Sequence, residues 1–328
     1  MTAGNQDDRR IQFYLAPLEG ITGYIFRNAV HTYFGGFDKY FIPFIKPNQK
    51  GHFSVREKQE LLREHNEGMR AIPQILTNSC EDFLRTARKL EQYGYEEVNL
   101  NLGCPSRTVV TKGRGAGFLA YPDRLDAFLE QIFDRCPIRI SIKTRLGMEK
   151  PEEFRRLLEI YDRYPAEELI IHPRVQADFY KNSVHLEAFR EAYFSGRNKI
   201  CYNGDIFTPE DYKNLVKEFP GLDRVMIGRG VLQNPGLARK IQTGKSMRKE
   251  ELKRFHDQIY CGYQEILCGE KTVLFKMKEL WTYLAPIFTD YKKYAKKIKK
   301  ATRLQAYEEG VEALFAEQEI EETAKWKR

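Results

Sequence analysis

Eight short apolar segments recur between residues 13 and 227, and most are followed by an amphipathic stretch of helical length. They are rich in β-branched or bulky residues and are bounded by Gly, Pro, Asn or charged residues, which is typical of buried parallel strands. This alternation favours an α/β fold, a (β/α)8 TIM barrel. A doubly wound open sheet is the alternative, although such sheets usually have fewer strands. The predicted strands are 13–16, 40–44, 72–76, 98–102, 138–142, 169–171, 199–202 and 225–227.

The segments between the predicted strands carry helix start signals. Ser79 precedes two acidic residues, and Thr208 precedes Pro209, a residue suited to the first helical turn. From about residue 249 onward the pattern is helical only, with no strand-like run. We therefore predict a catalytic barrel domain over residues 1–240 and a C-terminal all-helical domain over 245–328. The predicted barrel helices include 79–92, 122–134, 151–163, 185–194 and 208–218.

Composition narrows the class of protein. The first ten residues are polar, and no apolar run approaches the roughly 18 residues of a membrane helix, so we expect a cytoplasmic protein with no membrane association. The six cysteines form no CxxC pair and no Cys/His ladder, which predicts neither a metal site nor disulfides. The net charge of +8 is compatible with a polyanionic partner.

Active sites of such barrels form at the C-terminal ends of the strands. The fourth predicted strand ends in Asn101-Leu102-Gly103-Cys104-Pro105, where Gly103 permits a tight turn and Pro105 stiffens the exit. Most free cysteines are small buried hydrophobes. A cysteine between Gly and Pro at a strand end is more typical of a catalytic rim, so we predict a chemical role for Cys104.

The fifth and sixth strands lead into Lys143 and Arg145 and into His172 and Arg174. A lysine at the end of a buried strand is costly unless it meets an anion or an acceptor. A surface lysine and a satisfied polar histidine are the alternative interpretations. These residues would share the C-terminal rim of the barrel with Cys104, which favours a functional site over both alternatives.

The seventh and eighth strands end in Asn203-Gly204-Asp205 and Gly228-Arg229. In many barrels the loops after these two strands hold a phosphate, since glycine lets backbone N–H groups approach it. Each glycine pair alone is a weak signal because turns need glycine anyway. Both together predict a phosphorylated cofactor across the barrel mouth.

In this order, the motifs resemble those of the tRNA-dihydrouridine synthases. The sequence departs from the family pattern at Leu18, Glu19, Gly23 and 42–46, which leaves open the subfamily and the uridine reduced. The matching elements are Ala16-Pro17-Leu18, Gln74, Asn101 through Pro105, Lys112-Gly113 through Gly117, Lys143-x-Arg145, His172-x-Arg174, Asn203-Gly204-Asp205 and Gly228-Arg229.

The resemblance implies an FMN-dependent enzyme that consumes NADPH and reduces uridine to dihydrouridine in tRNA, with ribosomal RNA as an alternative substrate. Hydride would reach C6 of the uracil, and Cys104 would protonate C5. The implied cofactor contacts are Ala16, Pro17, Leu18 and Gln74 at the isoalloxazine, Lys143 and His172 on the flavin, and Asn203, Gly204, Asp205, Gly228 and Arg229 around the phosphate. The implied contacts to substrate or flavin edge are Asn101, Arg145 and Arg174.

A basic segment in the tail is predicted to form a helix over 291–304. Lys292, Lys296, Lys299 and Arg303 fall within about 60° of arc on that helix, opposite an apolar face. A solvated charged face is the usual fate of such runs. Here almost no acid is interleaved, so we predict a contact to RNA phosphates.

Two other functions are open at this point. A flavin barrel acting on a small molecule, similar to a dihydroorotate dehydrogenase, would share the phosphate loops but gives no reason for the basic tail. A catalytically idle RNA-binding barrel would tolerate the loss of Cys104 and Lys143, yet both are present. We expect a monomer, and the choice between NADPH and NADH stays open.

Overall fold

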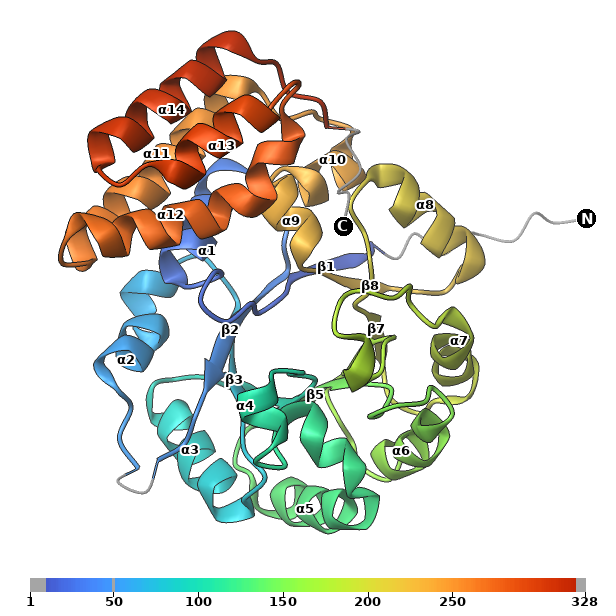
Figure 1. The fold of residues 1–328 in the computed structure, drawn as a ribbon. Coiled ribbons are helices and arrows are strands. Elements are labelled where there is room, and N and C mark those ends of the chain that lie inside the picture. Colours follow the sequence, from blue (N-terminus) through green and yellow to red (C-terminus); the bar gives the residue numbers. More distant parts are fainter. Residues whose placement is uncertain (1–9, 49–50, 323–328) are drawn as a thin grey trace, which may run out of the picture.

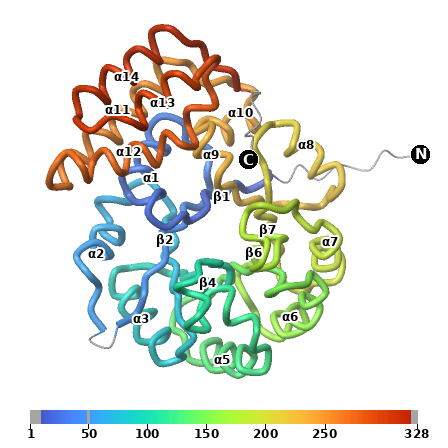
Figure 2. The backbone as a smooth tube through the Cα atoms, viewed as in Figure 1, coloured from blue at the N-terminus to red at the C-terminus, as the bar shows by residue number. Residues whose placement is uncertain are grey.

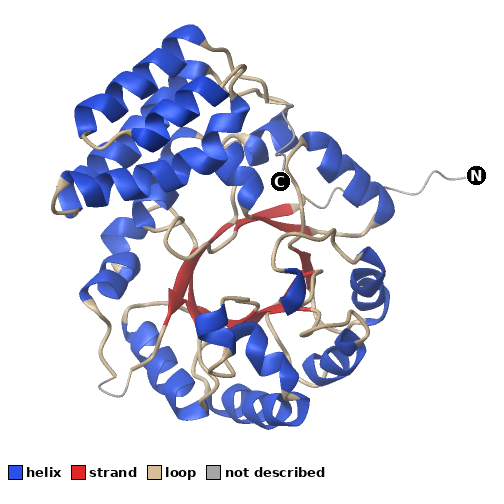
Figure 3. Cartoon of the chain, in the orientation of Figure 1, coloured by secondary structure: helices blue, strands red, loops and turns tan. Residues whose placement is uncertain are grey.

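Eight parallel strands close into a barrel in the computed structural model, which describes residues 10–48 and 51–322. Each strand pairs with the next along the chain, and β1 pairs with β8 (Figures 1 and 3). The predicted barrel and all eight predicted strands are confirmed. The strands are β1 (Gln12–Leu15), β2 (Lys39–Ile45), β3 (Ala71–Ile75), β4 (Glu97–Leu102), β5 (Arg139–Arg145), β6 (Leu169–His172), β7 (Ile200–Tyr202) and β8 (Arg224–Ile227).

One strand differs in length from the prediction in a way that concerns the site. Strand β5 continues beyond residue 142 to Arg145, because Lys143 and Arg145 pair with Ile170 and His172 of β6. Lys143 therefore lies within a strand rather than at its end. Strands β4 and β6, which flank β5, fix the position of Lys143.

Helices surround the barrel (Figure 3). The predicted start signals are confirmed: Ser79 Oγ accepts from the Asp82 N–H at 3.3 Å, and Thr208 Oγ accepts from the Asp211 N–H at 3.1 Å. The helices are α1 (Tyr24–Tyr33), α2 (Val55–Leu61), α3 (Cys80–Gln92), α4 (Arg107–Val110), α5 (Pro122–Arg135), α6 (Glu153–Tyr161), α7 (Leu186–Ser195), α8 (Pro209–Glu218) and α9 (Arg229–Gln233), with short 3-10 turns η1 (Arg63–Asn66), η2 (Gly115–Ala120) and η3 (Gln176–Asp178).

The barrel interior is closed at its N-terminal end by buried charges. Lys39 Nζ donates to both carboxylate oxygens of Glu97 and to Glu168, each at 2.9 Å, and Tyr14 Oη donates to Glu168 at 2.7 Å. Above this layer lies an apolar cluster that includes Tyr14, Phe41 and Met226. Both layers fill the barrel, so the free end is the C-terminal mouth.

The chain continues after the barrel as a helical region, beside α1 and α9 (Figures 1 and 2). Gly244, with φ +72°, ends the first of these helices. Phe255 packs edge-on against Phe26 and Phe34 of the barrel side, with ring centroids 5.7 and 5.5 Å apart. The helices are α10 (Leu237–Thr243), α11 (Lys249–Ile266), α12 (Glu270–Leu284), α13 (Lys292–Lys300) and α14 (Leu304–Glu317), with the turn η4 (Ala285–Ile287).

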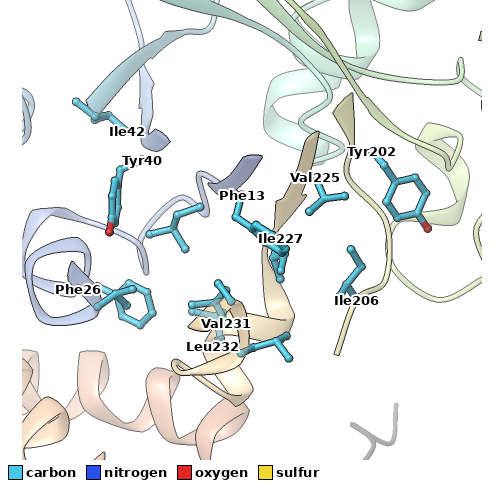
Figure 4. Close-up of a cluster of buried hydrophobic side chains, with 14 of the residues drawn as sticks. Phe13, Phe26, Tyr40, Ile42, Tyr202, Ile206, Val225, Ile227, Val231 and Leu232 are labelled. Atoms are coloured by element: carbon cyan, nitrogen blue, oxygen red, sulfur yellow. The ribbon is translucent and has the colours of Figure 1, made fainter. Parts of the chain in front are cut away.

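Barrel and helical region share one continuous apolar core. Figure 4 shows its part next to β1 and β8, where Val231 and Leu232 of α9 approach Phe26 of α1. The division into two domains at residues 240–245 therefore stays a prediction. Residues 1–9 and 323–328 of the two predicted domains lie outside the described residues.

The predicted basic helix is wrong at its C-terminal end. Helix α13 ends at Lys300, and Arg303 is the N-cap of α14, with φ −129° and ψ 154°. The chain turns there because Tyr294 and Ile298 form an apolar stripe that the returning α14 covers, with Gly310 close to Ile298. A continuous helix would leave that stripe in water.

Candidate active site

A pocket opens at the C-terminal ends of β1, β5, β6, β7 and β8. Every predicted cofactor residue except Gln74 lines it. Tyr180, Ile206, Phe207 and Gly230 line it too and were not predicted. The predicted residues in its wall are Ala16, Pro17, Leu18, Lys143, His172, Asn203, Gly204, Asp205, Gly228 and Arg229.

Lys143 brings a partly buried amino group to this pocket. In the part of the chain that the structure describes, the group has neither a hydrogen bond nor an ion pair. Burial, and then the positive charge of Arg145, lower the pKa of Lys143 to about 7. An anion or an acceptor in the pocket would relieve this cost, so the position is suited to one.

His172 lies beside Lys143 as a neutral imidazole. Arg174 donates from Nη1 to His172 Nε2 at 2.9 Å, which places the ring proton on Nδ1. Burial, and then the positive charges of Arg145 and Lys143, lower the pKa of His172 well below its usual value. The ring is therefore available as a neutral hydrogen-bond donor.

Asp205 binds two arginines. Its carboxylate accepts from Arg174 Nη2 at 2.6 Å and from Arg229 Nη2 at 2.5 Å. Arg174 is fully buried, and the side chain of Arg229 is 10% exposed. Two guanidinium groups against one carboxylate leave a net positive charge here, and Asp205 orients Arg229 within the pocket wall.

Arg145 and Arg174 lie behind the pocket wall. Arg145 is fully buried and donates to the carbonyls of Gly103, Val175 and Phe179 at 2.9, 2.9 and 2.8 Å. These bonds tie the loop after β4 to the loop after β6. The predicted contact of both arginines to substrate stays a prediction, and the contacts described make them positioning residues.

Cys104 lies at the mouth, in the loop after β4, and is half-buried. Asn101 Oδ1 accepts from the N–H groups of Gly103 and Cys104 at 3.0 and 2.9 Å. Asn101 Nδ2 donates to Gln74 Oε1 at 2.7 Å, and Gln74 in turn donates to Asn99 at 2.7 Å. Gln74 and Asn101 thus fix the turn that carries the thiol, and the predicted contact of Gln74 to the flavin stays a prediction.

The surroundings of Cys104 keep its thiol protonated. Burial raises its pKa above the usual value, a backbone hydrogen bond from Ser106 and the charges of Lys46 and Arg145 oppose this, and Glu19 adds to it. The net shift is upward. A protonated thiol at neutral pH is able to donate a proton.

Tyr180 is the site residue that sequence reasoning missed most clearly. It follows Phe179, a non-glycine residue with φ +49°, in the loop after β6. Its ring centroid lies 4.7 Å from the Arg229 guanidinium and 5.7 Å from the His172 ring. A loop aromatic has no periodic pattern, so no sequence signal could have placed it there.

The basic face of α13 is exposed as predicted for Lys292, Lys296 and Lys299. Arg303 is exposed as well, but it belongs to the cap of α14. Among the lysines of α13, the ion pair given by the described residues is Lys297 with Glu309, at 3.8 Å. The charge of this helix is therefore largely uncompensated.

Comparison with protein families gives a match over nearly the whole chain. The family model described as dihydrouridine synthase (Dus) matches residues 14–327, which includes the barrel and the helical region. The chain belongs to the dihydrouridine synthase family. The resemblance inferred from the strand-end motifs is thereby confirmed.

Curated relatives of this chain carry consistent names. A "Probable tRNA-dihydrouridine synthase" of Staphylococcus aureus (strain Mu50 / ATCC 700699) is 28% identical over 264 residues, 77% of this chain and 78% of its own. "tRNA-dihydrouridine synthase B" of Pasteurella multocida is 28% identical, over 71% of this chain and 69% of its own. The "tRNA-dihydrouridine(16) synthase" of Neisseria meningitidis serogroup B is 26% identical, over 73% of each chain.

Solved structures agree on the fold. Morphinone reductase superposes with a TM-score of 0.51 at 14% identity, over 72% of this chain and 86% of that one. TcOYE with pHBA gives 0.53 at 9% identity, over 78% and 95%. Within the described residues, no helix is both long and apolar enough for a membrane span, and no group of three or more His, Cys, Asp or Glu could hold a metal.

Proposed function

We propose that this chain reduces uridine to 5,6-dihydrouridine in tRNA, with FMN as bound cofactor and NADPH as reductant. The observation that carries the proposal is one rim that holds a protonated thiol, Cys104, after β4 and the Lys143 amino group, which has no partner among the described residues, on β5. The family match and the names of the relatives support the same reaction.

The pocket residues fit FMN. Lys143, without a partner among the residues that the structure describes, offers a cationic group suited to the pyrimidine end of a flavin. The loops after β7 and β8 bring Gly204, Gly228 and Gly230 into the pocket wall, where backbone without side chains is suited to a phosphate. Arg229, which Asp205 holds in place, adds positive charge for a phosphate beside these two loops.

When bound, FMN supplies the hydride chemistry, and the protein supplies orientation and electrostatics. Lys143 and the Nδ1–H of His172, which both line the pocket, would hold the cofactor. The turn fixed by Asn101 presents the Cys104 thiol at the mouth, where it donates its proton to C5 of the uracil. Arg145 keeps that turn in register with the loop that carries Tyr180.

The substrate uridine must leave its stack to enter the mouth, which costs a few kcal/mol. Binding energy for this step has to come from elsewhere on the RNA. Lys292, Lys296 and Lys299 on α13 provide an exposed basic face for its phosphates. A small-molecule substrate would give that face no function.

Two measurements test this function. The purified protein should be yellow and release FMN on denaturation; a colourless protein that cannot be reconstituted with FMN would rule out flavin chemistry. In cells that lack the chain, dihydrouridine should be missing from one position of tRNA. An unchanged tRNA with dihydrouridine lost from ribosomal RNA would move the substrate to the ribosome.

A further inference from the structure

An apolar groove lies between the barrel and the helical region, separate from the cofactor pocket. It is bordered by α1 and α2 on one side and by α11 and α12 on the other, and its volume is about 740 Å³. This volume is in the range of ligand-binding pockets, about 300–1,000 Å³. The apolar side chains in its wall are Tyr24, Ile25, Val55, Tyr263, Ile266 and Leu267.

The groove leads to the catalytic mouth. Arg56 and Glu60 on its rim also line a smaller hollow of about 170 Å³, which Glu19 and Lys46 border at the ends of β1 and β2. Glu19 follows β1, Lys46 follows β2 and Cys104 follows β4, so this hollow opens at the same C-terminal end of the barrel as the thiol. The groove and this hollow share Arg56 and Glu60 in their walls, so they are continuous with each other.

The groove exposes apolar side chains to water. Val55 is 79% exposed and Ile266 is 51% exposed. The ring of Tyr24 is stacked on His65, with centroids 4.0 Å apart and an interplanar angle of 4°, which presents a flat, fixed aromatic surface. The rim is polar, with Arg56, Gln59, Glu60 and Lys276. A ligand with a planar apolar face and polar edges would fit such a groove.

We propose that this groove takes unstacked nucleobases of the RNA strand that flanks the target uridine. The inference rests on the proposed function, because a strand opened to present one uridine exposes the faces of its neighbours. Proteins bind such bases by stacking on aromatic and apolar side chains, worth about 1–3 kcal/mol per base. Continuity with the mouth favours RNA over a protein partner as the occupant.

Ile266→Ser and Val55→Ser test the groove without adding charge. Both side chains are exposed, so the fold is preserved. With the FMN-loaded enzyme and tRNA, we expect KM for tRNA and the Kd from filter binding to rise about 5- to 100-fold in the double variant. Oxidation of NADPH without tRNA and kcat at saturating tRNA should stay as in the unmodified protein.

Phe275→Ser is the matched control. Phe275 is 68% exposed on α12 but is not in the groove wall, so its loss should leave KM unchanged. An equal rise in both variants, or no rise in either, would overturn the proposal.

Crosslinking separates this proposal from the proposed function. A photoreactive p-benzoylphenylalanine at position 266 should crosslink to radiolabelled tRNA, whereas the same group at position 275 should not. Binding and crosslinking need no turnover. A protein that reduces no uridine but crosslinks at position 266 would therefore contradict the proposed function and support the groove as an RNA-binding site. Normal turnover without a crosslink at 266 would overturn the groove alone.

Discussion

Two side chains at the barrel mouth owe their protonation state to the same cause. Burial disfavours the charged form of both, so it lowers the pKa of Lys143 to about 7 and raises the pKa of Cys104. For Lys143 this is a cost that a bound anion offsets. For Cys104 it is an advantage, because the neutral thiol is the form that donates a proton.

Replacing Lys143 with Met should weaken FMN binding about 10- to 100-fold, because the flavin would lose its hydrogen bond to a charged group, worth about 1.5–3 kcal/mol. Fluorescence titration of the flavin-free protein measures the affinity. Lys213→Met on the exposed surface of α8 is the control and should bind FMN normally. An unchanged affinity in Lys143→Met would remove this residue from the cofactor site.

Reduction of tRNA should fall as pH rises through the pKa of Cys104. The acid form is the active one, and burial raises that pKa, so the activity is fully present at neutral pH and is lost above the usual thiol range. Single-turnover reduction of tRNA by the pre-reduced enzyme gives the profile. Flavin reduction by NADPH should lack this alkaline loss; a shared profile would mean that the titrating group is not Cys104.

Much of this site could be predicted because strand residues alternate between two faces. Asn101, Lys143 and Ile170 pair across β4, β5 and β6, so strand position alone placed Lys143 next to Asn101, which holds the turn of Cys104. The hydrogen bonds of Asp205 with two arginines, and the place of Tyr180 in a loop, depend on side-chain packing that has no period in the sequence.

Helix α13 shows what helical periodicity can predict from a sequence and what it cannot. The spacing of Lys292, Lys296 and Lys299 correctly placed them on one exposed face. It failed at Arg303, because the helix ends where α14 returns to cover Tyr294 and Ile298. A helix terminus set by the packing of the next helix cannot be read from the helix itself.

Changing Lys292, Lys296 and Lys299 to Gln should weaken tRNA binding and reduce the slope of log K against log salt by about 2–3, since each lysine contributes up to about one counterion. Filter binding at several salt concentrations measures this. The control Lys213→Gln/Lys217→Gln changes exposed lysines on α8 of the barrel. A triple variant with the same slope as this control would return α13 to an ordinary solvated face.

In the whole molecule, the barrel and the helical region share one core. Phe255 is fully buried and lies against Phe26 and Phe34, so the two parts stabilise each other. The same contact holds the basic face of α13 and the apolar groove at fixed positions relative to the mouth. The proposed RNA-binding surface is thus one that neither part provides alone.

Phe255→Ala should lower the free energy of unfolding by about 3–5 kcal/mol and keep one unfolding transition. Urea unfolding followed by far-UV circular dichroism and by tryptophan fluorescence tests this, since Trp281 lies in α12. Phe194→Ala, which removes a 68% exposed ring, should change the stability by no more than about 0.5 kcal/mol. Separate transitions for the two probes would show that the two parts fold independently.

The most direct measurement is the dihydrouridine content of a tRNA population incubated with the purified FMN-loaded protein and NADPH, determined by mass spectrometry of its nucleosides. The protein should convert one uridine per acceptor tRNA, and Cys104→Ala should slow this by about 10²- to 10⁴-fold while NADPH still reduces the flavin. Equal dihydrouridine formation by Cys104→Ala, or none by the unmodified protein, would contradict the pairing of thiol and flavin across the barrel mouth.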